Sequence, residues 1–308
     1  WVGTDDGNIQ LSQDGGSTWT EVGTNIPGGT QNYYVSRVEA SHADPATAYA
    51  SLDGHRSDDL RPYIYMTNDF GETWTSIESD LPSFGNVRTI REDPKNRDLL
   101  YAGTEFGFYI SINGGDNWHQ FMSNLGTTRI DDVIIHPRDN DLILATHGRS
   151  VQIMDDITPL QDLNARILET DVHLFEPREA VLWKQDRRFS RSVTGAKTWQ
   201  GRNAPQGTNI SYYLKDGTDG TVSITITDLR TGEMFREIEG SQNQGLNRVM
   251  WDLRGTAPPI EENVNRGFFG QNQAPIAQPG TYRVTLEVNG ENLSQLVDVL
   301  EDVWMDER

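Results

Sequence analysis

The sequence of 308 residues contains no cysteine. Disulfide bonds and metal sites built on thiolates are therefore excluded, while this absence alone says nothing about the cellular compartment. No stretch reaches the eighteen or more apolar residues of a membrane-spanning helix, and we expect no membrane span. A signal peptide is missing too, but the sequence begins at Trp1 in the middle of a repeat. We give that absence no weight and expect the natural N-terminus to lie further upstream.

Basic residues are scarce, because 26 Lys and Arg stand against 46 Asp and Glu and give a formal net charge of −20. Nucleic acid and anionic membrane are disfavoured as partners, since their phosphates would repel this chain. Two interpretations of the acidity stay open. One is a solubilising surface on an extracellular or salt-adapted protein, and the other is an acidic site for cations or for a basic partner.

The usual motifs of cofactor and metal sites are absent from the sequence. It has no glycine-rich phosphate loop and no Ser-His-Asp signature, and its six histidines show no metal-ligand spacing. Residues 139–141 and 216–220 have a calcium-like composition but lack the bidentate Glu of an EF-hand loop, and they fit ordinary turns. We predict no cofactor and no metal site.

One short stretch occurs three times, over residues 12–19, 67–74 and 111–118. Each copy combines a hydroxyl residue, an Asx two positions later, a glycine and a closing tryptophan. The Asx side chain accepts hydrogen bonds from amides of its own turn, and glycine supplies the positive φ that a tight turn needs. Each copy therefore predicts the tip of a β-hairpin. The structural residues of these three tips are Asp14, Trp19, Asp69, Trp74, Asn113 and Trp118.

The copies lie within longer repeats of short strands. The closing tryptophans are 55 and 44 residues apart, and a period of this size with about four short strands is that of a β-propeller blade. A fourth repeat opens at residues 136–137, and its hairpin has decayed to residues 153–156. We predict an all-β chain that begins with an incomplete propeller of about three and a half blades over residues 1–165. The three tryptophans are then expected to be buried at equivalent places in successive blades.

The hairpin tips resemble the Asp-box (BNR) repeats shared by sialidases, some xyloglucan-cleaving glycosidases and sortilin-type propellers. Residues 145–150 (Ala-Thr-His-Gly-Arg-Ser) and 155–160 (Asp-Asp-Ile-Thr-Pro-Leu) resemble the propeller end of large bacterial sortilin-like repeat proteins. The resemblance implies that the boxes are structural turns and that the innermost strand of each blade lines the channel. It also implies that ligands bind on the face opposite the boxes, at the turns between the second and third strands of each blade.

These turns supply the candidate residues of a ligand-binding face: Asp5, Asp53, His55, Glu105, His147 and Arg149. Asp5, Asp53 and Glu105 would provide the paired carboxylates of glycosidic cleavage, but Asp-Gly pairs are also common turn chemistry. His147 and Arg149 match the family motif, and they would equally serve to fix the decayed last blade by hydrogen bonds. Four arginines lie near suitable strands, but no sequence motif predicts that they come together: Arg37, Arg88, Arg129 and Arg149.

The rest of the chain has a different texture. Residues 166–205 are predicted to form a linker, with a basic stretch within 183–202, and residues 206–304 to form an immunoglobulin-like β-sandwich. Asn289-Gly290 is a strong signal for a two-residue hairpin turn. Residues 245–252 and 279–282 resemble the immunoglobulin-like module of flagellar hook-capping and secreted bacterial proteins. The resemblance implies a non-catalytic spacer or docking unit.

We therefore expect a non-catalytic binding or scaffold portion of a larger bacterial propeller protein that is secreted, periplasmic or displayed at the cell surface. Its expected partners are the remaining propeller blades, from the same or another chain, with a protein or a carbohydrate as ligand. The alternative is a glycoside hydrolase, sialidase-like or xyloglucanase-like, with part of its catalytic machinery in a missing N-terminal region. A carboxylate pair about 5–10 Å apart across the ligand face favours the enzyme.

Overall fold

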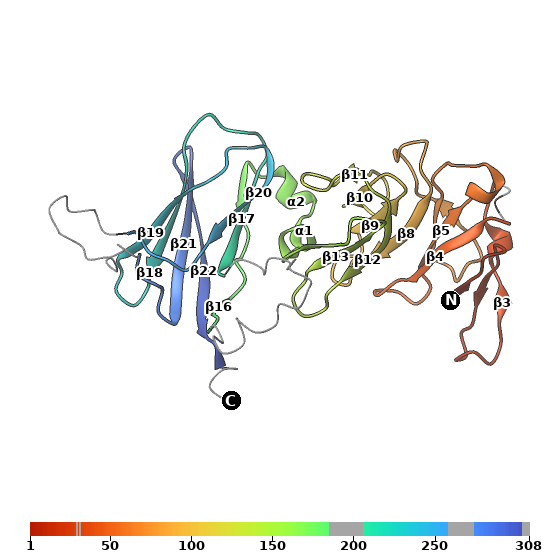
Figure 1. The fold of residues 1–308 in the computed structure, drawn as a ribbon, viewed down its shortest axis with the longest axis horizontal. Helices are drawn as coiled ribbons and strands as arrows, with labels where there is room; N and C mark the ends of the chain where they lie inside the picture. Colours follow the sequence, from red (N-terminus) through yellow and green to blue (C-terminus); the bar gives the residue numbers. More distant parts are fainter. Residues whose placement is uncertain (29, 31, 185–205, 258–273, 304–308) are drawn as a thin grey trace, which may run out of the picture. The chain divides into compact units, whose positions relative to one another are not determined.

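The computed structural model describes residues 1–28, 30, 32–184, 206–257 and 274–303. Short β-strands dominate, which confirms the prediction of an all-β chain. The chain divides into two compact units, Trp1–Leu163 (unit 1) and Asn164–Arg308 (unit 2), and we describe each by itself (Figure 1). Within the described ranges, none of the helices has the length and apolar character needed to traverse a bilayer.

Unit 1 consists of four successive antiparallel sheets, each of which is a meander in which strands that follow one another in sequence pair in space (Figure 1). The first and fourth sheets have three strands among the described residues, and the second and third have four. The elements are β1 (Val2–Gly3), β2 (Ile9–Leu11), β3 (Thr20–Glu21), η1 (Gly23–Asn25), β4 (Tyr34–Ala40), β5 (Ala48–Asp53), η2 (His55–Ser57), β6 (Ile64–Thr67), β7 (Thr75–Ser76), β8 (Val87–Glu92), β9 (Leu100–Thr104), β10 (Phe108–Ser111), β11 (His119–Gln120), β12 (Ile130–Ile135), β13 (Leu142–Thr146), β14 (Val151–Met154) and α1 (Thr158–Asp162).

The second strand of each four-stranded sheet is buried along its whole length. Every residue of β5 and β9 is buried, whereas both residues of β1 are exposed. The third and fourth sheets approach closely at Gly103 in β9. A Cβ added to this glycine would lie 2.8 Å from the Ile130 carbonyl oxygen. Small residues at this position therefore allow one sheet to pack directly on the next.

The box turns form as the sequence predicts. Asp14 Oδ1 accepts the backbone N–H of Thr18 at 2.9 Å, and the Asp14 carboxylate also accepts the Thr18 hydroxyl at 2.7 Å. These hydrogen bonds lower the pKa of Asp14 to about 2. Asp69 makes the equivalent pair of bonds with Thr73. Asn113 keeps the backbone bond, to Asn117, at 3.0 Å, so Asn can replace Asp in this turn.

The tryptophans of the boxes are not equivalent. The indole N–H of Trp74 donates to the Val22 carbonyl at 3.1 Å, and that of Trp118 to the Ile77 carbonyl at 2.8 Å. Both rings are buried, at 6% and 5% exposure. Trp19 is 50% exposed and donates to Gly16 within its own turn. The expectation of burial is therefore wrong for Trp19, because each buried ring packs on the preceding repeat and the described residues hold none before the first.

Unit 2 contains two sheets, with strand orders β15-β17-β20 and β16-β22-β21-β18-β19, that share one hydrophobic core. Its elements are α2 (Ala165–Glu169), β15 (Val172–Leu174), β16 (Ala180–Leu182), β17 (Thr208–Leu214), β18 (Val222–Asp228), β19 (Met234–Glu239), β20 (Gly245–Trp251), β21 (Gly280–Val288) and β22 (Glu291–Glu301). Alternate residues of the central strands are buried, as in β18, which is the period of a sheet with one face in the core. Trp251 and Tyr282 meet at the centre, with ring centroids 5.2 Å apart.

Part of the predicted linker is ordered as strand. β15 pairs antiparallel with β17, and β16 pairs parallel with β22, so the segment over residues 172–182 contributes to both sheets of unit 2. Val172 and Leu174 pack in the core or against it, and this apolar content within a mostly polar segment explains the difference. The basic stretch within 183–202 falls almost entirely outside the described residues.

Candidate functional site

The first strands of the second, third and fourth sheets of unit 1, which we call the inner strands, share one irregularity; they are β4, β8 and β12. Each has a register shift near its start, against the next strand of its sheet. The residues that the pairing skips are Ser36, Arg88 and Asp131. A β-bulge bends the strand and redirects the side chain of the extra residue. Three repeats thus each redirect one side chain at an equivalent position, and the residue types there are hydroxyl, cationic and anionic.

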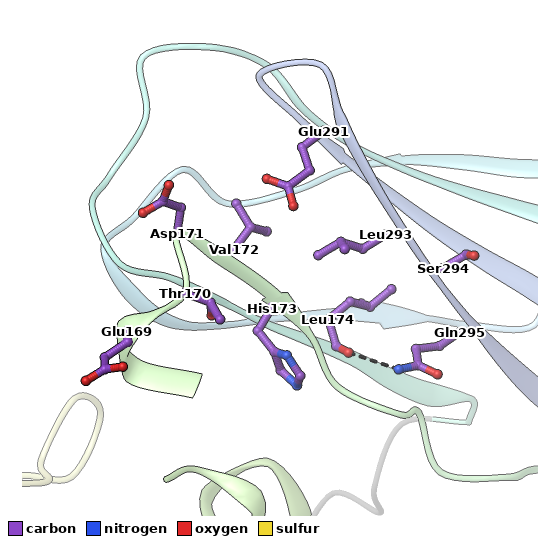
Figure 2. A pocket seen from close by; sticks show the side chains of 10 residues that line it. All are labelled: Glu169, Thr170, Asp171, Val172, His173, Leu174, Glu291, Leu293, Ser294 and Gln295. Carbon is purple, nitrogen blue, oxygen red and sulfur yellow. Dashed lines mark hydrogen bonds between the residues drawn. The ribbon is translucent and has the colours of Figure 1, made fainter. Parts of the chain in front are cut away.

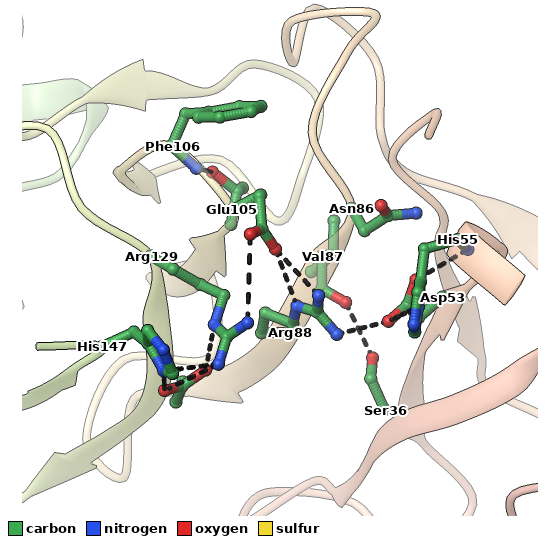
Figure 3. Close-up of polar contacts among 12 residues, drawn as sticks. Ser36, Asp53, His55, Asn86, Val87, Arg88, Glu105, Phe106, Arg129 and His147 are labelled. Carbon is green, nitrogen blue, oxygen red and sulfur yellow. Dashed lines mark hydrogen bonds and ion pairs between the residues drawn. The ribbon is translucent and has the colours of Figure 1, made fainter. Parts of the chain in front are cut away.

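Arg88 joins two neighbouring sheets. Its Nη1 forms an ion pair and hydrogen bond with Asp53 Oδ2, at the end of β5. Its Nη2 and Nε donate to Glu105 Oε2, directly after β9, at 2.8 and 3.1 Å (Figure 3). The Asp53 side chain is fully buried, and the Glu105 side chain is 31% exposed. A single guanidinium therefore pairs with two carboxylates through charge-assisted hydrogen bonds, which are stronger than neutral ones.

His55 completes the environment of Asp53. Its Nδ1 lies 2.8 Å from Asp53 Oδ2, and its backbone N–H donates to Asp53 Oδ1 at 3.0 Å. This residue opens the short helix η2, so the carboxylate of Asp53 fixes the start of the insertion that follows β5. Asp53 thus contacts both Arg88 and His55, and these contacts fix the turn that follows β5.

Arg129 extends the arrangement to the fourth sheet. Its Nε donates to Asp131 Oδ1 at 2.6 Å, its Nη1 lies 3.9 Å from Glu105 Oε1, and its Nη2 lies 2.6 Å from His147 Nδ1 (Figure 3). We call the linked residues the charged row: Asp53, Arg88, Glu105, Arg129, Asp131 and His147. Acidic and basic groups alternate along it, across the turns of three successive sheets.

A second ionic group lies on the same inner strands, one to three residues further along. Arg91 Nη1 lies 2.6 Å from Glu39 Oε2, and Arg91 Nη2 lies 3.2 Å from Asp132 Oδ1. Burial raises the pKa of Glu39 to about 7; Arg37 opposes the rise, and Glu92 and Asp132 add to it. This carboxyl group is therefore poised to titrate near neutral pH.

A small cavity of about 280 Å³ adjoins the charged row within unit 1. Phe84 and Phe106 form part of its wall, and their rings stack with centroids 5.5 Å apart. Both rings are also exposed, at 57% and 44%. The remaining lining residues are His55, Leu60, Gly85, Asn86, Arg88 and Glu105. The site therefore combines an apolar platform with charged groups.

The structure brings together four of the six sequence candidates, namely Asp53, His55, Glu105 and His147. Asp5 is exposed in the turn between β1 and β2, and Arg149 is exposed after β13, where its carbonyl accepts the Gln152 side chain at 2.9 Å. Neither belongs to the charged row. The ligand-binding role of all six stays a prediction.

Sequence reasoning missed the residues that connect the row, Arg88, Arg129 and Asp131. Arg88 and Arg129 were noticed only as arginines near suitable strands. Their position in the sequence could have identified all three residues, because each lies beside the first buried residue of an inner strand. The described residues contain no group of three or more His, Cys, Asp or Glu placed to hold a metal ion.

No family model matches the chain. The photosystem II assembly lipoprotein Ycf48 of Synechococcus sp. (strain CC9902) is 24% identical over 170 residues, which cover 54% of this chain and 46% of the relative. The oligoxyloglucan-reducing end-specific xyloglucanase of Emericella nidulans is 33% identical over 128 residues, covering 38% of this chain and 15% of the enzyme. This chain thus spans less than half the length of these curated relatives.

Two solved structures also match the chain. YCF48 bound to D1 peptide has a TM-score of 0.37 and 17% identity, with 52% of each chain covered. The GH74 xyloglucanase from Xanthomonas campestris has a TM-score of 0.39 and 10% identity, with 97% of this chain and 43% of the enzyme covered.

Proposed function

We propose that the chain is a non-catalytic binding segment of a larger Asp-box propeller protein, with the charged row as the face that holds its ligand. The observation that carries this proposal is the position of Arg88 between Asp53 and Glu105. One guanidinium is hydrogen-bonded to both carboxylates. A side chain in this position locks the turns of two sheets together and leaves neither carboxylate without a counter-ion.

This arrangement suits binding better than glycosidic cleavage. A glycosidase needs one protonated carboxyl group and one ionised carboxylate, both facing the scissile bond. The Asp53 side chain has no exposed surface, and Glu105 Oε2 already accepts two hydrogen bonds from Arg88. Hydrolysis remains the second candidate because a xyloglucanase is 33% identical over part of this chain.

The ligand that we propose for the charged row is an extended polypeptide. The groups at the open end of the row keep exposed surface, with 27% for Arg129, 40% for Asp131 and 65% for His147. They offer both donors and acceptors, which match the alternating N–H and C=O groups of a peptide backbone. The assembly lipoprotein among the relatives motivates a protein ligand for this chain.

We further propose that more repeats of the same kind pack on the first repeat, from the same or another chain. Trp74 and Trp118 both bury their rings on a preceding repeat. Trp19 has the same turn and an exposed ring, so an added repeat would bury apolar area of the kind that stabilises the other two boundaries. The proposed location is secreted, periplasmic or at the bacterial cell surface, in keeping with the lipoprotein relatives.

The test uses the whole chain and two probes. The first is oligoxyloglucan, with the release of reducing ends as the readout. The second is an array of synthetic peptides of equal length and graded charge, with bound protein as the readout. Arg129→Ala removes a charge from the row, and Arg138→Ala removes a charge from an exposed pair with Asp139 outside it, as a matched control.

We expect no reducing ends and selective binding to a subset of peptides. Arg129→Ala should weaken that binding about tenfold, the effect of losing a hydrogen bond to a charged group, while Arg138→Ala leaves it unchanged. Release of reducing ends that disappears in Glu105→Gln would overturn the proposal in favour of a hydrolase. Peptide binding that is equal in both arginine variants would remove the charged row as the binding face.

A further inference from the structure

Unit 2 has a long strand that is only partly covered. β22 extends over 11 residues, from Glu291 to Glu301. On the side away from β21, the described residues pair with it only through β16, at Val299, Leu300 and Glu301. The rest of this edge has no strand partner among the described residues. An uncovered strand edge is a template for the addition of another strand.

The direction of the backbone groups on β22 follows from its hairpin. Val288 and Glu291 flank the two-residue turn, and such a closing pair is hydrogen-bonded. Every second residue from Glu291 onward therefore bonds to β21, since the two kinds of pair alternate along an antiparallel ladder. The intervening residues Asn292, Ser294 and Leu296 direct their N–H and C=O groups to the uncovered edge.

Among the described residues β15 has no strand partner on the side away from β17, and this edge faces the same space. The Asp171 carbonyl accepts the Lys215 N–H at 3.0 Å, and the Phe175 N–H donates to the Ser211 carbonyl at 3.1 Å. By the same alternation, Val172 and Leu174 direct their backbone groups away from β17. The Leu174 carbonyl accepts the side-chain N–H of Gln295 at 3.2 Å (Figure 2). An amide side chain thus occupies a position that a strand backbone would otherwise take.

A cavity of about 610 Å³ lies between these two edges, and we call it the edge groove. This volume is within the range of pockets that bind ligands. Carboxylates of Glu169, Asp171 and Glu291 stand around it, with the apolar side chains of Val172 and Leu293 between them (Figure 2). The groove therefore offers unpaired strand edges, an apolar surface and negative charge.

We propose that the edge groove docks an extended segment of a partner protein rich in lysine and arginine, which adds as a strand to the free edge of β22. Main-chain hydrogen bonds to Ser294 and its edge neighbours hold the backbone, as in other cases of strand addition. Aliphatic stems of the basic side chains cover Val172 and Leu293 while their charged ends reach the carboxylates. A second copy of this chain is disfavoured because its net charge of −20 is repulsive.

The probe is a fluorescein-labelled hexapeptide of alternating lysine and valine, titrated with the whole chain and followed by fluorescence anisotropy. A second peptide has glutamate in place of each lysine. We expect the lysine peptide to bind and the glutamate peptide not to bind. The affinity should fall as salt rises from low to physiological ionic strength, because exposed charge pairs are screened. The experiment is independent of unit 1, so it can fail while the proposed function stands.

Ser294→Pro tests the strand edge. Proline removes an N–H that points to the uncovered edge and costs no bond to β21, and it is tolerated at such positions. The matched control is Glu239→Pro on β19, the opposite edge strand of the same sheet. Glu239 precedes Gly240, whose N–H bonds to the Val222 carbonyl, so the N–H of Glu239 also points outward. Circular dichroism verifies that both variants fold.

Ser294→Pro should weaken binding of the lysine peptide about tenfold or more, and Glu239→Pro should leave it unchanged. Glu291→Gln, which keeps the shape of the side chain, should weaken binding and reduce its salt dependence. Equal binding by Ser294→Pro and the unsubstituted chain would overturn strand addition. Equal binding of the lysine and glutamate peptides, or no binding of either, would overturn the proposed basic partner.

Discussion

The first repeat of unit 1 and the two that follow it have the same box turn but different packing. Gly16 and Gly71 both adopt positive φ, and Asp14 and Asp69 both accept from a threonine four residues later. Trp19 is nevertheless half exposed while its counterparts are buried. The turn is therefore a local structure that the sequence of one repeat determines. Burial of the tryptophan belongs to the boundary between two repeats.

The strands of the same repeats show the same difference. β1 is exposed along its length, whereas β5 and β9 are buried along theirs. The hydrogen-bond pattern of each hairpin is similar, so the contrast comes from packing between sheets. The first repeat thus keeps its turns and its pairing, while β1 and Trp19 are exposed.

The largest expected effect on stability comes from replacing the tryptophans of the boxes. Trp118→Ala removes a buried ring and its hydrogen bond to Ile77, and should lower the free energy of unfolding of unit 1 by about 3–5 kcal/mol. Trp19→Ala removes an exposed ring and should change it by less than about 0.5 kcal/mol. Urea unfolding of both variants measures the difference. Equal losses of unfolding free energy in the two variants would show that Trp19 and Trp118 contribute alike, against the contrast drawn above.

A second pair of variants separates the cost of backbone strain in the turn from the cost of packing against the preceding repeat. Gly16→Ala and Gly71→Ala each place a Cβ on a residue with positive φ, at 90° and 82°, which costs about 1–3 kcal/mol. The new Cβ at Gly71 would also lie 2.7 Å from Val22, an overlap worth a further 1–3 kcal/mol or so. Gly71→Ala should therefore be the more destabilising in urea unfolding. The comparison fails if Gly16→Ala costs as much.

A smaller effect concerns the inner strands and depends on pH. The pKa of Glu39 is raised from 4.5 to about 7 in the folded chain, so between these values the folded state holds a proton that the unfolded state has released. The stability from this group is fully present below pH 4.5 and is lost as the pH rises through about 7. Glu39→Gln should flatten this slope in thermal unfolding between pH 4 and pH 8. The other charged or ionisable side chains that face Glu39 are unchanged in this variant: Arg37, His42, Arg91, Glu92 and Asp132.

The smallest effect tests whether the turns are local. The pKa of Asp14 and that of Asp69 are both lowered from 3.8 by hydrogen bonds from threonine. Each carboxylate stabilises the fold above pH 3.8, and that stability is lost as the pH falls through the lower folded pKa. Asp14→Asn and Asp69→Asn should both reduce the acid sensitivity of unfolding, despite the different packing of their repeats. A variant that leaves the acid sensitivity unchanged would indicate that neighbouring repeats affect the turn.

The features that local chemistry controls were predictable from the sequence. The three box turns, the all-β character and the hairpin at Asn289-Gly290 follow from residues a few positions apart. The exposure of Trp19 was not predictable from its own repeat, because it depends on what packs against that repeat. The strands over residues 172–182 were missed because two short segments of three residues give too weak a periodic signal.

The candidate site was predictable in part for the same reason. Asp53, Glu105 and His147 follow directly from the turn positions of the repeats. Arg88 and Asp131 take part through bulges, which arise from the register between two strands and leave no motif in the sequence. The side chain that pairs with both carboxylates, Arg88, was the residue that sequence reasoning left unplaced.

The account is tested most directly by ¹⁹F NMR of the chain labelled with 5-fluorotryptophan. Resonances are assigned by single Trp→Phe variants, and the solvent isotope shift between H₂O and D₂O reports the exposure of each ring. The account predicts a large shift for Trp19 and small shifts for Trp74 and Trp118, in line with their 50%, 6% and 5% exposure. A small shift for Trp19, or large shifts for all three, would contradict the claim that the preceding repeat buries these rings.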